Sequence, residues 1–199
     1  MNVEHVLRAI DDAGKPLVAA IDGLHFAKSG IDVLQLRREE GDRRMRFLVT
    51  LALDAPVIHM DDFFLSYEMR TAQRLAQPGG NFDLERFTVQ VALPLSHGES
   101  FSYGVYDCSA GSITGERHIP RGDVVIVEGA YSMHPELQTL YGLRIFCDID
   151  PRTQLERLRE RESKQSLQNF IEKWIPMEEK YLEAFGIEAL CDIVLRAGA

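Results

Sequence analysis

Short apolar runs alternate along the chain with amphipathic segments of helical period. Each apolar run is a few residues long and ends at polar or turn-forming residues, which is typical of strands buried on both faces of a parallel sheet. The predicted strands are 16–22, 55–60, 123–129, 143–149 and 191–197. Helical patterns fall at roughly 2–13, 45–53, 84–96, 151–163 and 166–185. This alternation predicts an α/β fold with a doubly wound, mostly parallel sheet.

One stretch interrupts the alternation. Residues 100–122, SFSYGVYDCSAGSITGERHIPRG, are typical of a β-hairpin, which we expect to project from the domain. Further on, Asp150 and Pro151 supply a cap and a first-turn proline for the helix predicted at 151–163.

Composition and charge narrow the class of protein. With 199 residues and 45% apolar composition, the chain can bury one substantial core, so 1–199 is predicted to be a single domain. The formal charge of −9 argues against nucleic acid as a partner. No apolar run approaches the ~20 residues of a membrane span. Three scattered cysteines without metal-type spacing favour a reduced, cytoplasmic protein.

Acidic residues stand where the predicted strands end. They are Asp22, Asp61, Asp62, Glu128, Asp148 and Asp150. In open α/β sheets ligands bind beyond the carboxyl ends of the strands, and carboxylates gathered there suit a hydrated divalent cation. The alternative for each is a helix cap, which is favoured for Asp150.

Several long motifs carry a resemblance to a known family. In order, they are HMDDFFLSYEMRTAQRLAQPGGNFDLERF, SFSYGVYDCSAG, VVIVEGAYSMHPEL, LRIFCDIDPRTQLERLRERE and IPMEEKYLEAFGIEALCDIVL. Together with KPLVAAIDG at 15–23, they closely resemble the uridine kinase-like branch of the phosphoribulokinase and uridine kinase family. The resemblance implies a P-loop kinase fold with a C-terminal helical lid region. It also implies ATP and Mg²⁺ as cofactors, and transfer of the γ-phosphoryl group to a hydroxyl of a uridine-like or cytidine-like nucleoside.

The resemblance assigns roles to individual residues. Asp61 matches the carboxylate that accepts the proton of the acceptor hydroxyl and lies near the magnesium ion, and Glu128 matches the acid that helps to hold that ion. Asp83 matches the aspartate that binds ribose hydroxyls, and Tyr106 matches an aromatic residue of the base pocket. Each has a structural alternative: a helix cap for Asp61 or Asp83, a structural acid for Glu128 and cross-strand packing for Tyr106.

The acceptor stays open at this point. Where a uridine-binding relative has a histidine, this chain has Ala110 and Gly111. A sugar, a pantothenate-like alcohol and a phosphosugar are therefore alternative acceptors, since the family shares one core across those substrates. A homo-oligomer is equally open.

Arginines concentrate in the segment PRTQLERLRERE at 151–162. In the family an arginine-bearing lid closes over the phosphates, and Arg159 and Arg161 align best with it. The interleaved glutamates are also typical of a solvated, salt-bridged helix surface, which is the alternative interpretation.

The residues after the first predicted strand stand where a phosphate loop is expected. That loop has the pattern G-x-x-x-x-G-K-[ST], whose backbone N–H groups, lysine and hydroxyl bind phosphates and magnesium. From Gly23 this chain reads G-L-H-F-A-K-S-G, with Ala27 in place of the second glycine. We interpret the stretch as the remnant of a phosphate loop, with Gly23, Lys28 and Ser29 as its candidate ligands.

Residues 24–44 look like replaced or inserted sequence, because the span to the second strand is longer than one helix requires. An evolved loss, a frameshifted region and an engineered change would all have this appearance. Two function classes follow: a working kinase, or a non-catalytic relative that binds a small molecule or regulates a partner.

The remaining cysteine, histidine and aromatic residues are predicted to have structural roles. Cys147 and Cys191 are predicted to be small core residues, and His59 to be packed. We expect Phe170, Trp174 and Tyr181 to form the buried faces of the C-terminal helices.

Overall fold

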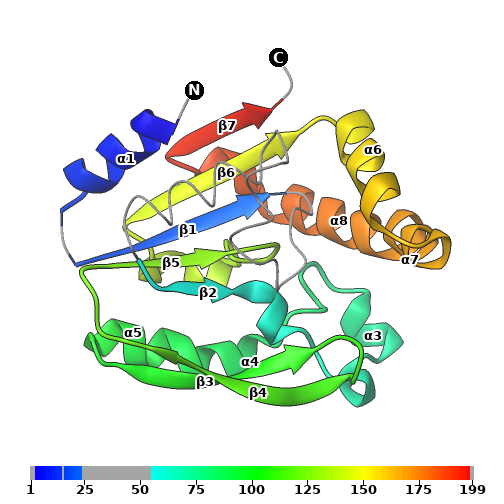
Figure 1. The fold of residues 1–199 in the computed structure, drawn as a ribbon, viewed down its shortest axis with the longest axis horizontal. Coiled ribbons are helices and arrows are strands. Elements are labelled where there is room, and N and C mark those ends of the chain that lie inside the picture. Colours follow the sequence, from blue (N-terminus) through cyan, green and yellow to red (C-terminus); the bar gives the residue numbers. More distant parts are fainter. Residues whose placement is uncertain (1–2, 15, 24–54, 198–199) are drawn as a thin grey trace.

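The computed structural model describes residues 3–14, 16–23 and 55–197, and its central element is a five-stranded sheet (Figure 1). The strands are β1 (Leu17–Gly23), β2 (Val57–His59), β5 (Val124–Glu128), β6 (Leu143–Ile149) and β7 (Ile193–Ala197). Their order is β2-β5-β1-β6-β7, and every neighbouring pair is parallel. The predicted α/β class and all five strands are confirmed.

The sheet is covered on both faces by apolar side chains, as its continuous apolar strands require. On one face Val6 and Ile10 of α1 (Val3–Asp12) are fully buried against strand residues such as Ala19 and Ile145. The other face packs aromatic residues that include Phe82, Phe87 and Tyr181. This second face is the larger of the two described cores. Burying each large apolar side chain stabilises the fold by about 1.5–3 kcal/mol.

Helical turns line the chain between the strands. The short ones are η2 (Met60–Phe63), η3 (Tyr67–Met69), α3 (Ala72–Leu75), η5 (Pro135–Leu140) and η7 (Ile187–Leu190). The long predicted helices appear as α6 (Pro151–Arg161) and two composite helices. The first joins α4 (Leu84–Phe87), η4 (Thr88–Ala92) and α5 (Leu93–His97); the second joins α7 (Lys164–Asn169), η6 (Phe170–Trp174) and α8 (Ile175–Phe185).

Each composite helix contains a wide π turn just before a proline. The N–H of Leu93 donates to the carbonyl oxygen of Thr88, and the N–H of Ile175 donates to that of Phe170, five residues back in both cases. Pro94 and Pro176 follow directly. Because a proline ring clashes with the carbonyl four residues earlier in a regular α-helix, the wide turn lets the helix continue through it.

The predicted hairpin is formed by β3 (Phe101–Asp107) and β4 (Ser112–Ile119), which are antiparallel. It lies along the α4–α5 helix (Figure 1) and is fastened there. Arg86 donates to the carbonyl oxygen of Gly104 over 2.7 Å, and the Gly104 N–H donates to Gln90 over 3.2 Å. The hairpin is therefore part of the body of the molecule and does not project freely.

The C-terminal helical region gathers at the carboxyl ends of the strands. Figure 1 shows α6, α7 and α8 beyond the tips of β1 and β6. Asp150 caps α6 by accepting from the Thr153 N–H over 3.0 Å, as predicted, and Ser163 caps α7 in the same way. Among the described residues, no helix is long and apolar enough to cross a membrane.

Candidate functional site

The carboxyl ends of β1, β2 and β5 meet at one edge of the sheet. Glu128, the last residue of β5, is in register with Ile21 of β1 on one side and with His59 of β2 on the other. Asp61 follows His59 by two residues in the turn η2. The two acids predicted to act at the reacting centre thus lie at the ends of adjacent strands.

The two neighbouring aspartates, Asp61 and Asp62, differ in access. The Asp62 side chain is 0% exposed, whereas that of Asp61 is partly exposed. Asp62 accepts a hydrogen bond from the Tyr103 hydroxyl over 3.0 Å and lies 3.6 Å from Arg117, both on the hairpin. Arg86 also donates to its backbone carbonyl oxygen. Asp62 therefore fastens the hairpin to the sheet, and Asp61 is the carboxylate of the pair that a ligand can reach.

Tyr131 marks the centre of this edge. It has a φ of 73°, in the left-handed region that non-glycine residues rarely adopt, and its ring packs edge-on against Tyr181 at 5.0 Å. Burial raises the pKa of Tyr131 well above its ordinary value, and the charges of Glu178, Asp22 and Asp61 raise it further. The strained backbone of Tyr131 is held by the packing of its buried ring against Tyr181.

Asp22 has a structural role at the end of β1. Its side chain is buried and accepts from the Gly23 N–H at 2.7 Å, the Met133 N–H at 3.0 Å and the Tyr181 hydroxyl at 2.7 Å. These bonds join β1 to the segment after β5 and to α8. Of the other acids at strand ends, Asp148 pairs with Arg196 at 3.4 Å. Asp22, Asp148 and Asp150 are thus occupied within the protein.

His59 corrects an expectation, because it is not simply packed. Its Nδ1 lies 2.5 Å from Oε1 of Glu128, and its side chain is 29% exposed. The imidazole therefore orients the Glu128 carboxylate at the site edge. The sequence carries no local signal for this contact, because it depends on the register of β2 against β5, which brings His59 opposite Glu128.

Asp83 and Tyr106 both have partners inside the protein. Asp83 caps α4 by accepting from the Arg86 N–H at 3.1 Å, and its other oxygen lies 3.4 Å from Arg86 Nε. The Tyr106 hydroxyl accepts from Arg70 at 2.9 Å, and the residue is 4% exposed. The cap proposed as the structural alternative for Asp83 is therefore present, while the predicted substrate contacts of Asp83 and Tyr106 stay predictions.

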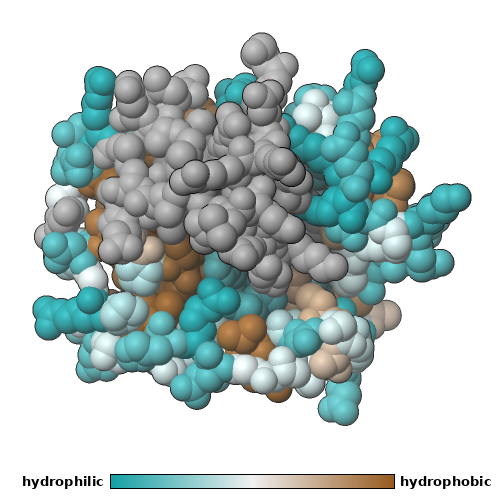
Figure 2. Space-filling view, viewed as in Figure 1, coloured by the Kyte–Doolittle hydropathy of each residue, from teal (hydrophilic) through white to brown (hydrophobic). Residues whose placement is uncertain are grey.

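The lid arginines lie on a hydrophilic surface. Arg161 pairs with Glu162 at 2.9 Å and lies 5.8 Å from the centre of the Phe170 ring, whereas Arg159 is exposed. Figure 2 shows mostly hydrophilic residues over this region. Arg159 agrees with a solvated helix surface, whereas the Arg161 side chain is only 17% exposed; the predicted phosphate contacts of both stay predictions.

The C-terminal helices are less uniformly buried than expected. Tyr181 is fully buried, and Cys147 is buried in β6. Phe170 and Trp174, in contrast, are half-buried and contact cationic side chains, so the prediction that they form helix-face core is wrong. Both lie in the π turn η6, which rotates them away from the face that the α8 residues bury.

The glycine at the end of β1 has a packing reason. A Cβ atom on Gly23 would lie 2.3 Å from the carbonyl oxygen of Cys147 on the neighbouring strand β6. Lys28 and Ser29, the other candidate phosphate ligands, lie outside the described residues, as do the helix predicted at 45–53 and the whole segment 24–44.

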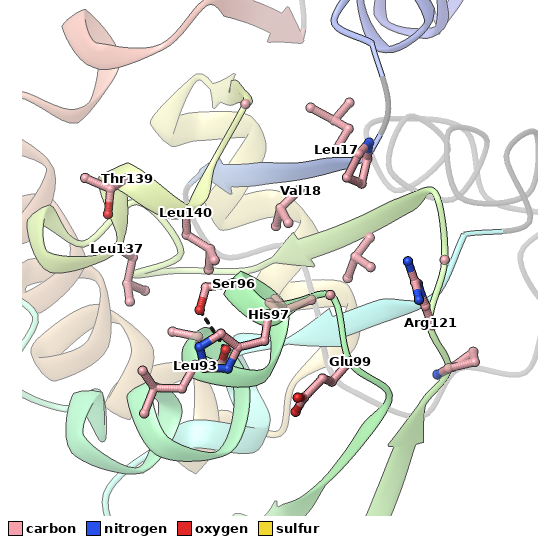
Figure 3. A pocket seen from close by; sticks show the side chains of 18 of the residues that line it. Leu17, Val18, Leu93, Ser96, His97, Glu99, Arg121, Leu137, Thr139 and Leu140 are labelled. Atoms are coloured by element: carbon pink, nitrogen blue, oxygen red, sulfur yellow. Dashed lines mark hydrogen bonds between the residues drawn. The ribbon is translucent and has the colours of Figure 1, made fainter.

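A cavity lies at the opposite edge of the sheet, at the amino ends of the strands (Figure 3). It has a volume of about 700 Å³, and Leu17 and Val18 from β1 form one wall. Leu95 and Leu140 add apolar surface, with Arg121 at the rim. None of the predicted site residues lines it, so this cavity is separate from the candidate active site.

Comparison with known proteins identifies the fold. No family model matches the sequence. The structure is similar to that of a possible uridine kinase from Bacillus stearothermophilus, with a TM-score of 0.65, 20% identity and coverage of 97% of this chain and 96% of that one. It is also similar to D-glycerate 3-kinase from Cryptococcus neoformans, with a TM-score of 0.58, 13% identity and coverage of 89% and 87%.

A third similar structure is phosphoribulokinase from Rhodobacter spheroides, with a TM-score of 0.51, 12% identity and coverage of 92% of this chain and 70% of that one. The chain has the kinase fold that these three structures share. Their names differ in the acceptor, so the likeness does not identify what this chain acts on.

Proposed function

We propose that the chain is a phosphotransferase of the uridine kinase-like type, formed by 1–199 as one domain, which transfers the γ-phosphoryl group of ATP to a hydroxyl of a nucleoside or similar small molecule. The observation that carries the proposal is the register of the site edge. Asp61 and Glu128 lie at the carboxyl ends of adjacent strands β2 and β5, on a sheet of kinase topology.

In this proposal Asp61 orients the acceptor hydroxyl and accepts its proton. Phosphoryl transfer needs mainly an oriented nucleophile and neutralised charge, so one reachable carboxylate beside the transferred group meets the first need. Asp62 cannot take the role in the described arrangement because it is buried and committed to Tyr103. Asp83 and Tyr106 contact the acceptor, next to the segment that follows Asp61.

The site fits a magnesium ion with few protein ligands. Among the described residues no group of three or more acidic, histidine or cysteine side chains is arranged to hold a metal. Magnesium, however, keeps most of its waters and binds through one or two carboxylates together with substrate phosphates. Asp61 and Glu128 would hold it, with His59 orienting Glu128. The ion would neutralise charge on the transferred phosphoryl group.

ATP binding is the step that most needs a test. Gly23, Lys28 and Ser29 are the candidate phosphate ligands after β1, and Arg159 and Arg161 approach the phosphates from the lid. The second candidate function, a non-catalytic relative that binds a small molecule or regulates a partner, is favoured by one observation. The stretch from Gly23 departs from the phosphate-loop pattern, because Ala27 stands in place of the second glycine.

The experiment is a calorimetric titration of Mg-ATP into the purified chain, followed by a coupled assay of ADP release with a panel of hydroxyl acceptors. We expect Asp61→Asn to lower turnover by about 10²–10⁴-fold with ATP binding retained, because it removes the general base. Asp123→Asn is the matched control, since Asp123 is exposed at the amino end of β5.

The phosphate ligands are tested in the same titration. Loss of ATP binding in Lys28→Ala would identify Lys28 as the side chain that binds the phosphates. If the unmodified chain binds no nucleotide at millimolar concentration, catalysis is excluded and the non-catalytic function is favoured.

The setting of the protein is part of the proposal. Reduced cysteines and an acidic surface fit a cytoplasmic enzyme that acts on small molecules and not on nucleic acid or membranes.

A further inference from the structure

Two cations and three aromatic rings form a cluster between the site edge and the lid region. The guanidinium carbon of Arg70 lies 4.9 Å from the centre of the Tyr67 ring, 5.7 Å from that of Tyr106 and 5.7 Å from that of Trp174. Nζ of Lys173 lies 4.3 Å from the centre of the Trp174 ring. We call these five residues the cation cluster.

Among the residues that the structure describes, no carboxylate pairs with the cations of the cation cluster. Within the described part of the chain, neither Arg70 nor Lys173 forms an ion pair with a carboxylate, whereas Arg74, Arg86, Arg117, Arg144 and Arg161 all do. What sets Arg70 and Lys173 apart from other unpaired cations of the described residues, such as Arg159 and Lys164, is that both lie against the ring of Trp174. Burial lowers the pKa of Lys173, and the charge of Arg70 lowers it further, so the two cations repel each other. An anion between them would relieve that repulsion.

Arg70 is held in place and still has free donors. Its Nε donates to the carbonyl oxygen of Leu65 at 2.8 Å, and one terminal nitrogen donates to the Tyr106 hydroxyl at 2.9 Å. A guanidinium has five N–H donors in a rigid fork, and only these two bonds are formed with described residues. The remaining donors are preorganised for a carboxylate or phosphate, which the fork binds in a bidentate manner.

The same residues leave little room for a stacked base. Tyr106, the predicted base-pocket aromatic, is 4% exposed and lies beside the Arg70 guanidinium. The Tyr67 ring packs on Gly111, where a Cβ atom would lie 2.3 Å from it, and the Tyr67 hydroxyl donates to the carbonyl oxygen of Cys108 at 2.7 Å. The hairpin tip is thus filled by the protein's own side chains.

The cation cluster is close to the reacting edge along the chain. Leu65, which accepts from Arg70, is four residues after Asp61, so their Cα atoms are at most about 14 Å apart. A short bridge between Phe64 and Phe82 ties this segment to the strand-like residues before Asp83. The Arg70 fork is therefore anchored to the same short segment that carries Asp61.

We propose that Arg70 and Lys173 bind an anionic group of the phosphoryl acceptor, which makes the acceptor a phosphorylated or carboxylated hydroxy compound and not a neutral nucleoside. This inference rests on the proposed function, because it names the substrate class of the same site. Trp174 contacts both cations and covers the anion from the side of η6.

The single tryptophan of the chain gives a direct readout. Trp174 fluorescence is titrated with D-ribose 5-phosphate and with D-glycerate, which separate phosphate from carboxylate. D-ribose and uridine serve as neutral probes, and all titrations are made at constant ionic strength without ATP. We expect at least one anionic probe to change the fluorescence at a concentration at least tenfold below that of either neutral probe.

Variants assign the effect to the cation cluster. Arg70→Gln should weaken binding of the anionic probe by about 10–100-fold, the range for a lost hydrogen bond to a charged group. Lys173→Gln should weaken it about 3–10-fold. Lys164→Gln is the control, because Lys164 is an exposed lysine at the start of α7. Lys173 is at the surface, so its variant tests the proposal even if Arg70→Gln fails to fold.

Three results would overturn the inference: uridine binding more tightly than both anions, anion binding unchanged in the Arg70 and Lys173 variants, or no anionic probe binding at all. The inference and the proposed function fail separately. Arg70-dependent anion binding without any ATP turnover contradicts the kinase but supports the anion site. Turnover of uridine alone supports the kinase and contradicts the anion site.

Discussion

The two edges of the sheet differ in how their polar groups are arranged. At the carboxyl edge, Asp22, Asp62 and Glu128 are buried and each is held by protein donors. At the amino edge, the cavity has a mixed apolar and polar lining, and its charged residues Glu99 and Arg121 are exposed. The cavity of about 700 Å³ therefore lies at the amino edge, where the charged side chains are exposed to solvent and not fixed by protein donors. Organised charge, and not cavity size, marks the edge where chemistry is expected, because fixed polar groups stabilise a reaction without reorganising.

The largest expected difference between the edges is in the stability contributed by a single aspartate. Asp22→Ala leaves the Met133 N–H and the Tyr181 hydroxyl buried without an acceptor. We expect the free energy of unfolding to fall by about 4 kcal/mol, at 1–3 kcal/mol for each unsatisfied group plus lost packing. Urea unfolding followed by circular dichroism measures it. Asp123→Ala at the amino edge should change it by less than about 0.5 kcal/mol; equal effects would contradict the comparison.

A smaller effect is expected where the hairpin joins the carboxyl edge. Tyr103→Phe removes the hydroxyl that donates to the buried Asp62 carboxylate at 3.0 Å. We expect a loss of about 1.5–3 kcal/mol in unfolding free energy, the range for hydrogen bonds to charged groups. Tyr67→Phe is the matched control, since its hydroxyl is on an exposed residue and donates to a neutral carbonyl. A loss in Tyr67→Phe as large as in Tyr103→Phe would show that the Asp62 charge is not important.

The smallest expected effect is on the pH dependence of the unfolding free energy. It concerns His134, in the segment that leads from the carboxyl edge of the sheet back to the amino edge. Burial lowers the pKa of His134, and Arg74 lowers it further against the opposing charges of Glu136 and Glu85. The unfolded chain therefore takes up a proton near pH 6.5 while the folded chain does not. Stability should be complete above this value and fall as the pH drops from about 6.5 through the folded-state pKa. His134→Asn should flatten the profile; an unchanged slope would contradict it.

Much of the fold could be predicted from the sequence, because the strands are continuous apolar runs whose ends are acidic. The five strands and the Asp150 cap follow from local signals of this kind. The division of labour between Asp61 and Asp62 could not be predicted, since it depends on Tyr103 and Arg117, about forty to fifty-five residues further on. The same holds for the cation cluster, whose members come from η3, the hairpin and η6.

Trp174 shows why one prediction failed. The helical periodicity at 166–185 predicts one regular helix, and in such a helix Trp174 and Tyr181 would share a face. The π turn η6 inserts an extra residue and breaks that periodicity, so Tyr181 is buried while Trp174 faces Arg70 and Lys173. Pro176 was the available signal, because an internal proline rarely leaves the preceding turn regular.

The π turns also link chain length to the prolines that follow them. A helix advances by about 100° per residue, so the extra residue in 88–92 fixes the direction in which Leu95 and the rest of α5 point. Deleting one residue there would restore ordinary winding, but it would bring the Pro94 ring against the carbonyl group four residues earlier. In each composite helix, a deletion in the π turn must therefore be accompanied by replacement of the proline that follows, Pro94 in one and Pro176 in the other. Each helix can lose this residue only together with its proline.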